Sequence, residues 1–210
     1  MTTDTSAGSS QEAGGGNSSA SSLAAKLTSF VIFQVVYTAC VLGAARGWLW
    51  AGPLSAVLLL PINLRFVPRG SRLPELRLWA LVGLIGFVVD SALLRSGLIG
   101  FPEITRFAPG AALTGWLVPP WIVVLWIAVG SILHSSLGWL AGKPLLAIVL
   151  GAIGGPFSFW SGSRFGAVEL PRGNLTLAAL ALEYAVIMPV LLALAYPSSP
   201  PERSGHAPGH

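Results

Sequence analysis

Charged side chains are scarce in this sequence. Asp, Glu, Lys and Arg make up 10% of its 210 residues, whereas hydrophobic residues make up 53%. An average soluble domain carries about 25% charged residues. So few charged groups could not cover that much apolar surface in water. The composition therefore excludes an ordinary soluble domain and indicates a protein whose solvent is lipid.

Cysteine is nearly absent too, since Cys40 is the only one. A single cysteine excludes a disulfide within the chain and a zinc site built on paired cysteines. Histidine is almost as rare: His206 and His210 lie in a polar tail, and no second histidine or acid lies at metal-ligand spacing near His134. We therefore expect no metal ion and no cofactor.

The positive charge of the chain is small and dispersed. The net charge is +4, but the Lys and Arg residues are spread over short connections, without a basic helix face or interleaved aromatic residues. We therefore expect no nucleic-acid partner. Membrane lipid and another membrane protein are the partners that this composition favours.

Long apolar segments make up most of the chain and predict an all-α fold, a transmembrane helix bundle with six spans. Each segment is long enough to cross a hydrocarbon core of about 30 Å. Residues 1–22 and 197–210 are rich in Ser, Gly and Pro and are predicted to be disordered tails that flank one membrane domain, 23–196. The six predicted spans are residues 27–45, 48–66, 77–99, 113–136, 144–166 and 175–196.

An even number of spans places both tails on one side of the membrane. The short connections on the tail side carry more Lys and Arg than those on the opposite side, mainly because four arginines lie between residues 65 and 77. The positive-inside rule therefore predicts cytoplasmic tails.

One acid, Asp90, lies within the third predicted span. An aspartate at the centre of a span costs about 2.5–3.5 kcal/mol on insertion scales. Gly83, Gly86 and Gly97 fall on the same helical face as Asp90, so another helix could approach closely and cover the carboxylate. We interpret Asp90 either as a structural anchor paired with an arginine or as a proton or ligand site.

Glu183 is the corresponding acid in the last predicted span. Arg164 could pair with either acid, and Arg95, one turn beyond Asp90, is the rival partner. Two carboxylates could act as general acid and base or relay protons, or they could belong to structural ion pairs. His134, at the end of the fourth span, is interpreted as a hydrogen-bonding residue of a helix interface or as a ligand.

The fifth predicted span has the densest pattern of small residues. Ala147, Gly151 and Gly155 recur every four residues, a spacing typical of a face on which another helix packs. Pro156 follows Gly154 and Gly155, so we expect the helix to kink or break there. An opened backbone at this point could line a ligand cavity.

Four stretches carry a resemblance to a known family: Phe33-Gln34 through Gly47, the Asp90 segment, Pro119 through Ser135, and Gly151 through Glu169. Together they are similar to a bacterial family of inner-membrane proteins known only as a domain of unknown function. The resemblance covers about residues 27–195, and its most specific piece is the Gly-Gly-Pro segment with Arg164 and Glu169. It implies a polytopic protein of the bacterial inner membrane and implies no activity.

Three functional hypotheses fit these observations. Because the sequence has no nucleotide-binding loop, metal-ligand set, nucleophile motif or internal repeat, the leading one is a membrane protein that binds or assembles around a lipid or a membrane partner. The first alternative is a small proton-coupled transporter in which Asp90 or Glu183 is the protonation switch. The second is a lipid-modifying intramembrane enzyme in which Asp90, Glu183 or His134 acts as acid or base.

Overall fold

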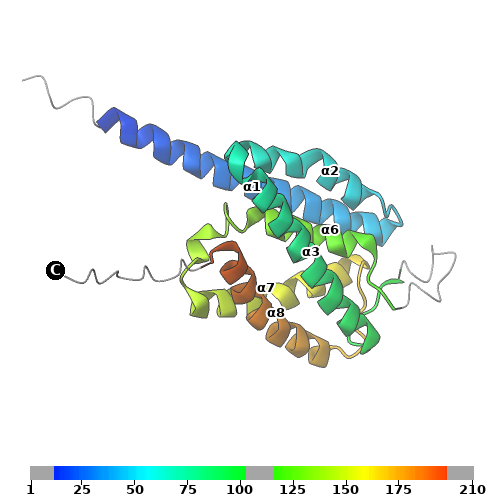
Figure 1. Ribbon diagram of the computed structural model, residues 1–210. Coiled ribbons are helices and arrows are strands. Elements are labelled where there is room, and N and C mark those ends of the chain that lie inside the picture. The colour runs from blue at the N-terminus through cyan, green and yellow to red at the C-terminus, as the bar shows by residue number, and fades with distance from the viewer. Residues whose placement is uncertain (1–11, 103–115, 198–210) are drawn as a thin grey trace, which may run out of the picture.

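Apolar helices form a single bundle in the computed structural model, which describes residues 12–102 and 116–197 (Figure 1). Within these ranges the only β-type pairing is an isolated antiparallel bridge between Gly100 and Glu169. The predicted all-α membrane bundle is confirmed. The helices are α1 (Glu12–Arg46), α2 (Ala51–Asn63), α3 (Arg72–Arg95), α6 (Pro120–Ile132), α7 (Pro144–Phe165) and α8 (Asn174–Ala195).

Four of these helices are long and apolar enough to cross a membrane, namely α1, α3, α7 and α8, whereas α2 and α6 are shorter apolar helices. The second and fourth predicted spans are thus shorter than expected. The turn at Gly47, which has a φ of +78°, delays the start of α2. Pro119 and Pro120 set the start of α6, because proline is favoured in the first turn of a helix and cannot continue a preceding one.

Helix α1 begins at Glu12, inside the stretch predicted to be disordered. Once an apolar segment has nucleated a helix, each added residue gains a backbone hydrogen bond, so the helix can extend through polar residues ahead of the span. The N-terminal part of α1 runs past the other helices in Figure 1. Residues 1–11 and 198–210 of the predicted tails lie outside the described residues.

The bundle consists of two helix groups, which contact each other through α1 and α7 and through α3 and α8. Helices α1 and α2 form a hairpin, α6 packs against α1, α2 and α3, and α7 packs along α8. Figure 1 shows the α7–α8 pair on one side of α3 and α6. Successive helices alternate in direction, which gives the bundle two ends. We call them the His134 end, where α3 begins and α8 stops, and the Glu169 end, where α3 stops and α8 begins.

Glycines allow the close helix approaches in both groups. A Cβ atom on Gly86 would overlap the ring of Trp126, and one on Gly83 would lie 2.8 Å from Cγ1 of Ile127. On α7, Gly151 and Gly155 lie directly against Tyr184 of α8. Both sets of glycines thus bring an aromatic side chain against a neighbouring helix backbone.

Helix α7 runs without interruption from Pro144 to Phe165, with Pro156 inside it. The break predicted at Gly154-Gly155-Pro156 is therefore not present. Packing of the buried Ala147, Gly151 and Gly155 along α8 holds the helix through the proline.

Candidate functional site

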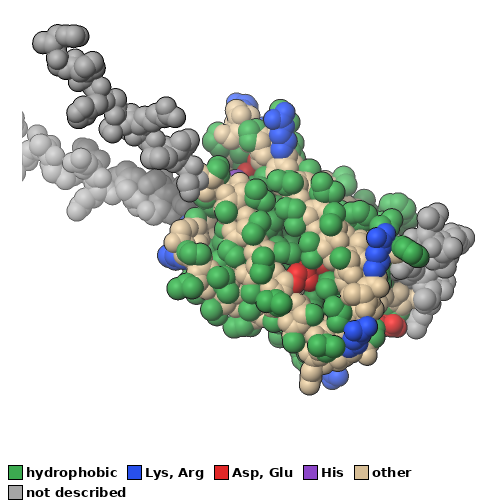
Figure 2. Space-filling view, turned by 60° about the horizontal axis from the view of Figure 1, so that its bottom comes forward, with side chains coloured by type: hydrophobic (Ala, Val, Ile, Leu, Met, Phe, Trp, Pro, Cys, Tyr) green, Lys and Arg blue, Asp and Glu red, His purple; other side chains and the backbone are tan. Residues whose placement is uncertain are grey.

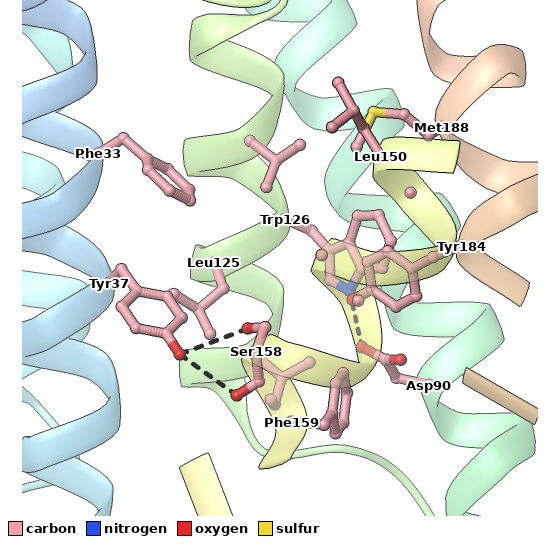
Figure 3. Close-up of a pocket in the computed structure, with 15 residues that line it drawn as sticks. Phe33, Tyr37, Asp90, Leu125, Trp126, Leu150, Ser158, Phe159, Tyr184 and Met188 are labelled. Atoms are coloured by element: carbon pink, nitrogen blue, oxygen red, sulfur yellow. Dashed lines mark hydrogen bonds between the residues drawn. The ribbon is translucent and has the colours of Figure 1, made fainter. Parts of the chain in front are cut away.

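A cavity of about 170 Å³ lies where α1, α6, α7 and α8 come together around the carboxylate of Asp90 (Figure 3). Its walls are mostly aromatic and aliphatic. A cavity of roughly 150 Å³ lined by apolar side chains accommodates a benzene molecule. The cavity is lined by Phe33, Tyr37, Asp90, Ile122, Leu125, Trp126, Val129, Leu150, Gly151, Gly154, Gly155, Ser158, Phe159, Tyr184 and Met188.

The cavity opens between α1 and α7. At one end of this crevice the Tyr37 hydroxyl donates a hydrogen bond to the backbone carbonyl of Ser158 at 3.3 Å and lies 3.4 Å from the Ser158 Oγ atom. Phe33 lies toward the other end (Figure 3). Leu150 and Gly154 line the cavity and are exposed on the surface of α7. Helix α7 is long and apolar enough to cross a membrane, so a mouth on its exposed side would open toward lipid.

Asp90 is the buried acid of the cavity, with 1% of its surface exposed. Its Oδ2 atom accepts a hydrogen bond from the indole N–H of Trp126 at 2.6 Å. Its Oδ1 atom has no hydrogen-bond partner among the described residues. Gly86, one turn before Asp90 on α3, makes room for the Trp126 ring. The glycine face noted in the sequence thus positions the donor that binds the carboxylate.

Glu183 reaches the same region from α8. The next residue, Tyr184, stacks on Trp126 with ring centroids 5.4 Å apart and lines the cavity, whereas Glu183 does not line it, although its charge interacts with that of Asp90. Both carboxylate oxygens of Glu183 are buried and without a hydrogen-bond partner among the described residues. Figure 2 shows an acidic side chain in the middle of an otherwise apolar face.

The arginines predicted as partners of these acids lie elsewhere. The guanidinium of Arg95 donates to the Trp116 carbonyl at 3.1 Å and lies over the Trp116 ring. Arg164 lies over the ring of Trp160, 5.9 Å from its centroid. Neither guanidinium is within ion-pair distance of a carboxylate in the part of the chain that is described. Both arginines lie in the last turn of a helix, so their long side chains can reach toward the lipid headgroups.

His134 belongs to a separate polar cluster at the other end of the bundle. Its Nδ1 atom lies 2.7 Å from Oε2 of Glu75, and its Nε2 atom lies 2.7 Å from the carbonyl oxygen of Ala195. Glu75 also accepts a hydrogen bond from the Trp79 indole at 2.9 Å. The cluster therefore ties the beginning of α3 and the end of α8 to the segment that follows α6.

Two features complete the His134 cluster. Burial, with a smaller contribution from the charge of Glu75, raises the pKa of Tyr196 above its usual value. The protonated hydroxyl donates to the backbone carbonyl of His134 at 3.4 Å. A cavity of about 90 Å³ beside Glu75 and His134 is also lined by Asn63, whose Oδ1 atom is buried without a partner among the described residues. This cavity is polar enough to hold water.

Sequence reasoning missed Glu75, Trp126 and Tyr184. Glu75 was placed in a connection because the third span was expected to begin at residue 77, whereas α3 begins at Arg72. Trp126 had a usable signal, since it lies in the middle of an apolar segment while tryptophan usually marks the ends of spans. The sequence gives no comparable signal for Tyr184.

A family model described as "Protein of unknown function (DUF2878)" matches residues 26–190. No curated protein and no solved structure matches the chain. The family match thus covers every side chain that lines the 170 Å³ cavity.

Proposed function

Because the chain belongs to the DUF2878 family of proteins of unknown function, we propose a function from its own geometry. The protein binds a small, largely apolar molecule that it takes from the bilayer. One observation carries this proposal: an aromatic cavity of about 170 Å³ whose mouth, at Leu150 and Gly154, lies on a membrane-crossing helix. The apolar lining suits a hydrocarbon or aromatic body, and the lateral mouth suits entry from lipid.

The shape of the site supports binding rather than simple helix packing. Tyr184 packs directly against Gly151 and Gly155, whereas a Cβ atom added to Gly154 would meet no atom within 4 Å. Helix α7 thus uses two of these glycines to pack on α8 and leaves the third at the open mouth. The proposed setting is the bacterial inner membrane, with the tails in the cytoplasm, supported by the arginines that precede and begin α3.

The test uses a small photoreactive apolar probe, 3-trifluoromethyl-3-phenyldiazirine, added to the protein in lipid nanodiscs. We expect saturable labelling of cavity residues, read by peptide mass spectrometry, above the level of the lipid-facing surface. Gly154→Leu should block the mouth and abolish the saturable component. Ala80→Leu, at an exposed position of α3 outside the cavity, is the matched control and should leave labelling unchanged. Uniform, non-saturable labelling that Gly154→Leu does not alter would contradict the proposal.

A proton-coupled transporter is the second candidate. The favouring observation is that three carboxylate oxygens of Asp90 and Glu183 are buried without a hydrogen-bond partner among the described residues. Such groups in a membrane interior commonly mark ion or proton pathways. In proteoliposomes, a transporter would couple a pH gradient to ligand accumulation, and Glu183→Gln would remove the coupling. Equal accumulation with and without the gradient would rule this candidate out.

A further inference from the structure

The Asp90–Glu183 pair has unused capacity for a ligand. Oδ2 of Asp90 accepts from Trp126, but Oδ1 of Asp90 and both oxygens of Glu183 have no partner among the described residues. Asp90 is 1% exposed and lines the cavity, whereas Glu183 lies behind the lining residues. An unpartnered carboxylate oxygen in a membrane interior is costly, so a pair of this kind indicates that something else completes the site.

The charge of the pair is not balanced by a neighbouring side chain. Among the described residues, one pair of acidic and basic side chains lies within ion-pair distance, Glu75 and His134 at the opposite end of the bundle. Arg95 and Arg164 contact Trp116 and Trp160 instead. Two carboxylates that interact in apolar surroundings cannot both remain ionised without a compensating positive charge, so they must hold protons or a cation.

The cavity walls suit an organic cation. Trp126 and Tyr184 stack on one another beside Asp90, and Phe159 meets Tyr184 edge-on with ring centroids 6.3 Å apart. Aromatic faces attract cations, most strongly where water is excluded. A ligand with a positive end could therefore contact a carboxylate and an aromatic face together, while its apolar body fills the remaining volume toward Leu150 and Phe33.

We propose that Asp90 binds the positively charged end of an amphipathic organic cation, of the size of a protonated or quaternary benzylamine, and that the nearby Glu183 adds negative charge beside this site. This inference rests on the proposed binding function and names the chemical class of its ligand. Without the ligand, the acid pair holds a proton, and entry of the cation releases that proton from the carboxyl to water.

Few other titratable groups face the pair. Helix α1 contributes Tyr37 and α8 contributes Tyr184, both of which interact electrostatically with this region. Helices α6 and α7 present Trp126, glycines, Ser158 and Phe159, which do not titrate in the working range. Proton release on cation binding would therefore come from Asp90 and Glu183.

The experiment compares two probes of nearly identical shape. Benzyltrimethylammonium carries a permanent charge, and neopentylbenzene replaces its nitrogen with carbon. Binding to the protein in nanodiscs is measured by displacement of the photoprobe described above, and proton release is measured in weak buffer with a pH indicator. We expect the cation to bind at least about tenfold more tightly than the neutral probe, and only the cation to release a proton.

Variants assign the effect to the two acids. Asp90→Asn should weaken binding of the cation about tenfold or more, and Glu183→Gln should weaken it by a smaller factor. Both variants should leave binding of the neutral probe unchanged. Glu169→Gln, an exposed acid at the Glu169 end, is the matched control and should change neither. Retained binding of neopentylbenzene shows that each variant is folded.

The outcomes separate the two proposals. If neopentylbenzene binds as tightly as the cation and the acid variants change nothing, the cation inference is wrong while the apolar binding function stands. If the cation binds but Asp90→Asn and Glu183→Gln bind it normally, the charge is recognised elsewhere and the inference is again wrong. Absence of saturable photolabelling would overturn the binding function itself.

Discussion

The imidazole of His134 lies between two hydrogen-bond acceptors, Oε2 of Glu75 and the backbone carbonyl of Ala195, each at 2.7 Å. Glu75 is 7% exposed and His134 is 38% exposed, so this pair lies at the rim of the bundle rather than in its centre. It connects the start of α3 to the end of α8, two helices that otherwise touch little.

The first prediction concerns this pair. Glu75→Gln and His134→Ala should each lower the free energy of unfolding. Because the two residues are in direct contact, the double variant should lower it by about 0.5–3 kcal/mol less than the sum of the two single effects. Chemical unfolding in detergent micelles measures the three free energies. Combining His134→Ala with Glu169→Gln, at opposite ends of the bundle, is the control and should be additive. If the effects of Glu75→Gln and His134→Ala simply added in the double variant, the contact between the two residues would contribute nothing to stability.

The second prediction compares two glycines that differ in surroundings. A Cβ atom on Gly86 would overlap the Trp126 ring, whereas one on Gly154 would meet nothing within 4 Å. Gly86→Ala should therefore lower the free energy of unfolding by about 1–3 kcal/mol through overpacking. Gly154→Ala should be neutral or slightly stabilising, since alanine favours helix. Thermal unfolding of both variants checks this, and a loss in Gly154→Ala as large as that in Gly86→Ala would contradict the packing described here.

The third prediction isolates the donor to Asp90. Trp126→Phe keeps an aromatic ring against Tyr184 but removes the N–H that Asp90 accepts. We expect Trp126→Phe to lower the free energy of unfolding by about 1–3 kcal/mol, which is typical of leaving a buried acceptor without its donor. Asp90→Asn in the Trp126→Phe background should recover part of that loss, because the amide is neutral. Trp160→Phe, at an exposed position on α7, serves as the control for loss of an indole.

The fourth prediction tests the orientation proposed for the membrane. Cys40 is 1% exposed, so the native protein should not react with a membrane-impermeant maleimide. Arg172→Cys, between α7 and α8, should be labelled in intact cells, and Arg69→Cys, between α2 and α3, only after lysis. The reverse pattern would place the tails outside the cytoplasm.

The last two helices of the chain could be predicted more closely than the others. The predicted spans 144–166 and 175–196 differ from α7 and α8 by at most one residue at each end. Pro144 and Gly166 mark the ends of α7, and a long apolar run interrupted by a single acid, Glu183, marks α8. The length of α6 could not be predicted, since the apolar character continues past Ile132 into turns. The pairing of Glu75 with His134 depends on how α3 meets α6, which no local pattern encodes.

The candidate site was predictable only in part. Asp90 and Glu183 stand out because acids are rare in apolar spans, but their positions relative to one another depend on how the α7–α8 pair is placed against the rest of the bundle. The arginine partners were inferred from charge alone. In the structure, tryptophans near the helix ends hold Arg95 and Arg164, which an account based on charge complementarity does not anticipate.

The lateral mouth at Leu150 and Gly154 also determines how this protein could discriminate among ligands. A molecule that enters from the bilayer has already left water, so transferring its apolar body into a cavity lined by leucine and phenylalanine yields less free energy than the same transfer from water, as for helix association in lipid. Partitioning sets the local concentration of every hydrophobic compound, and the apolar walls then favour those compounds whose shape fits the cavity. Selectivity must then come from the few groups that hydrocarbon lacks, the indole of Trp126, the phenol of Tyr184 and the carboxylate of Asp90.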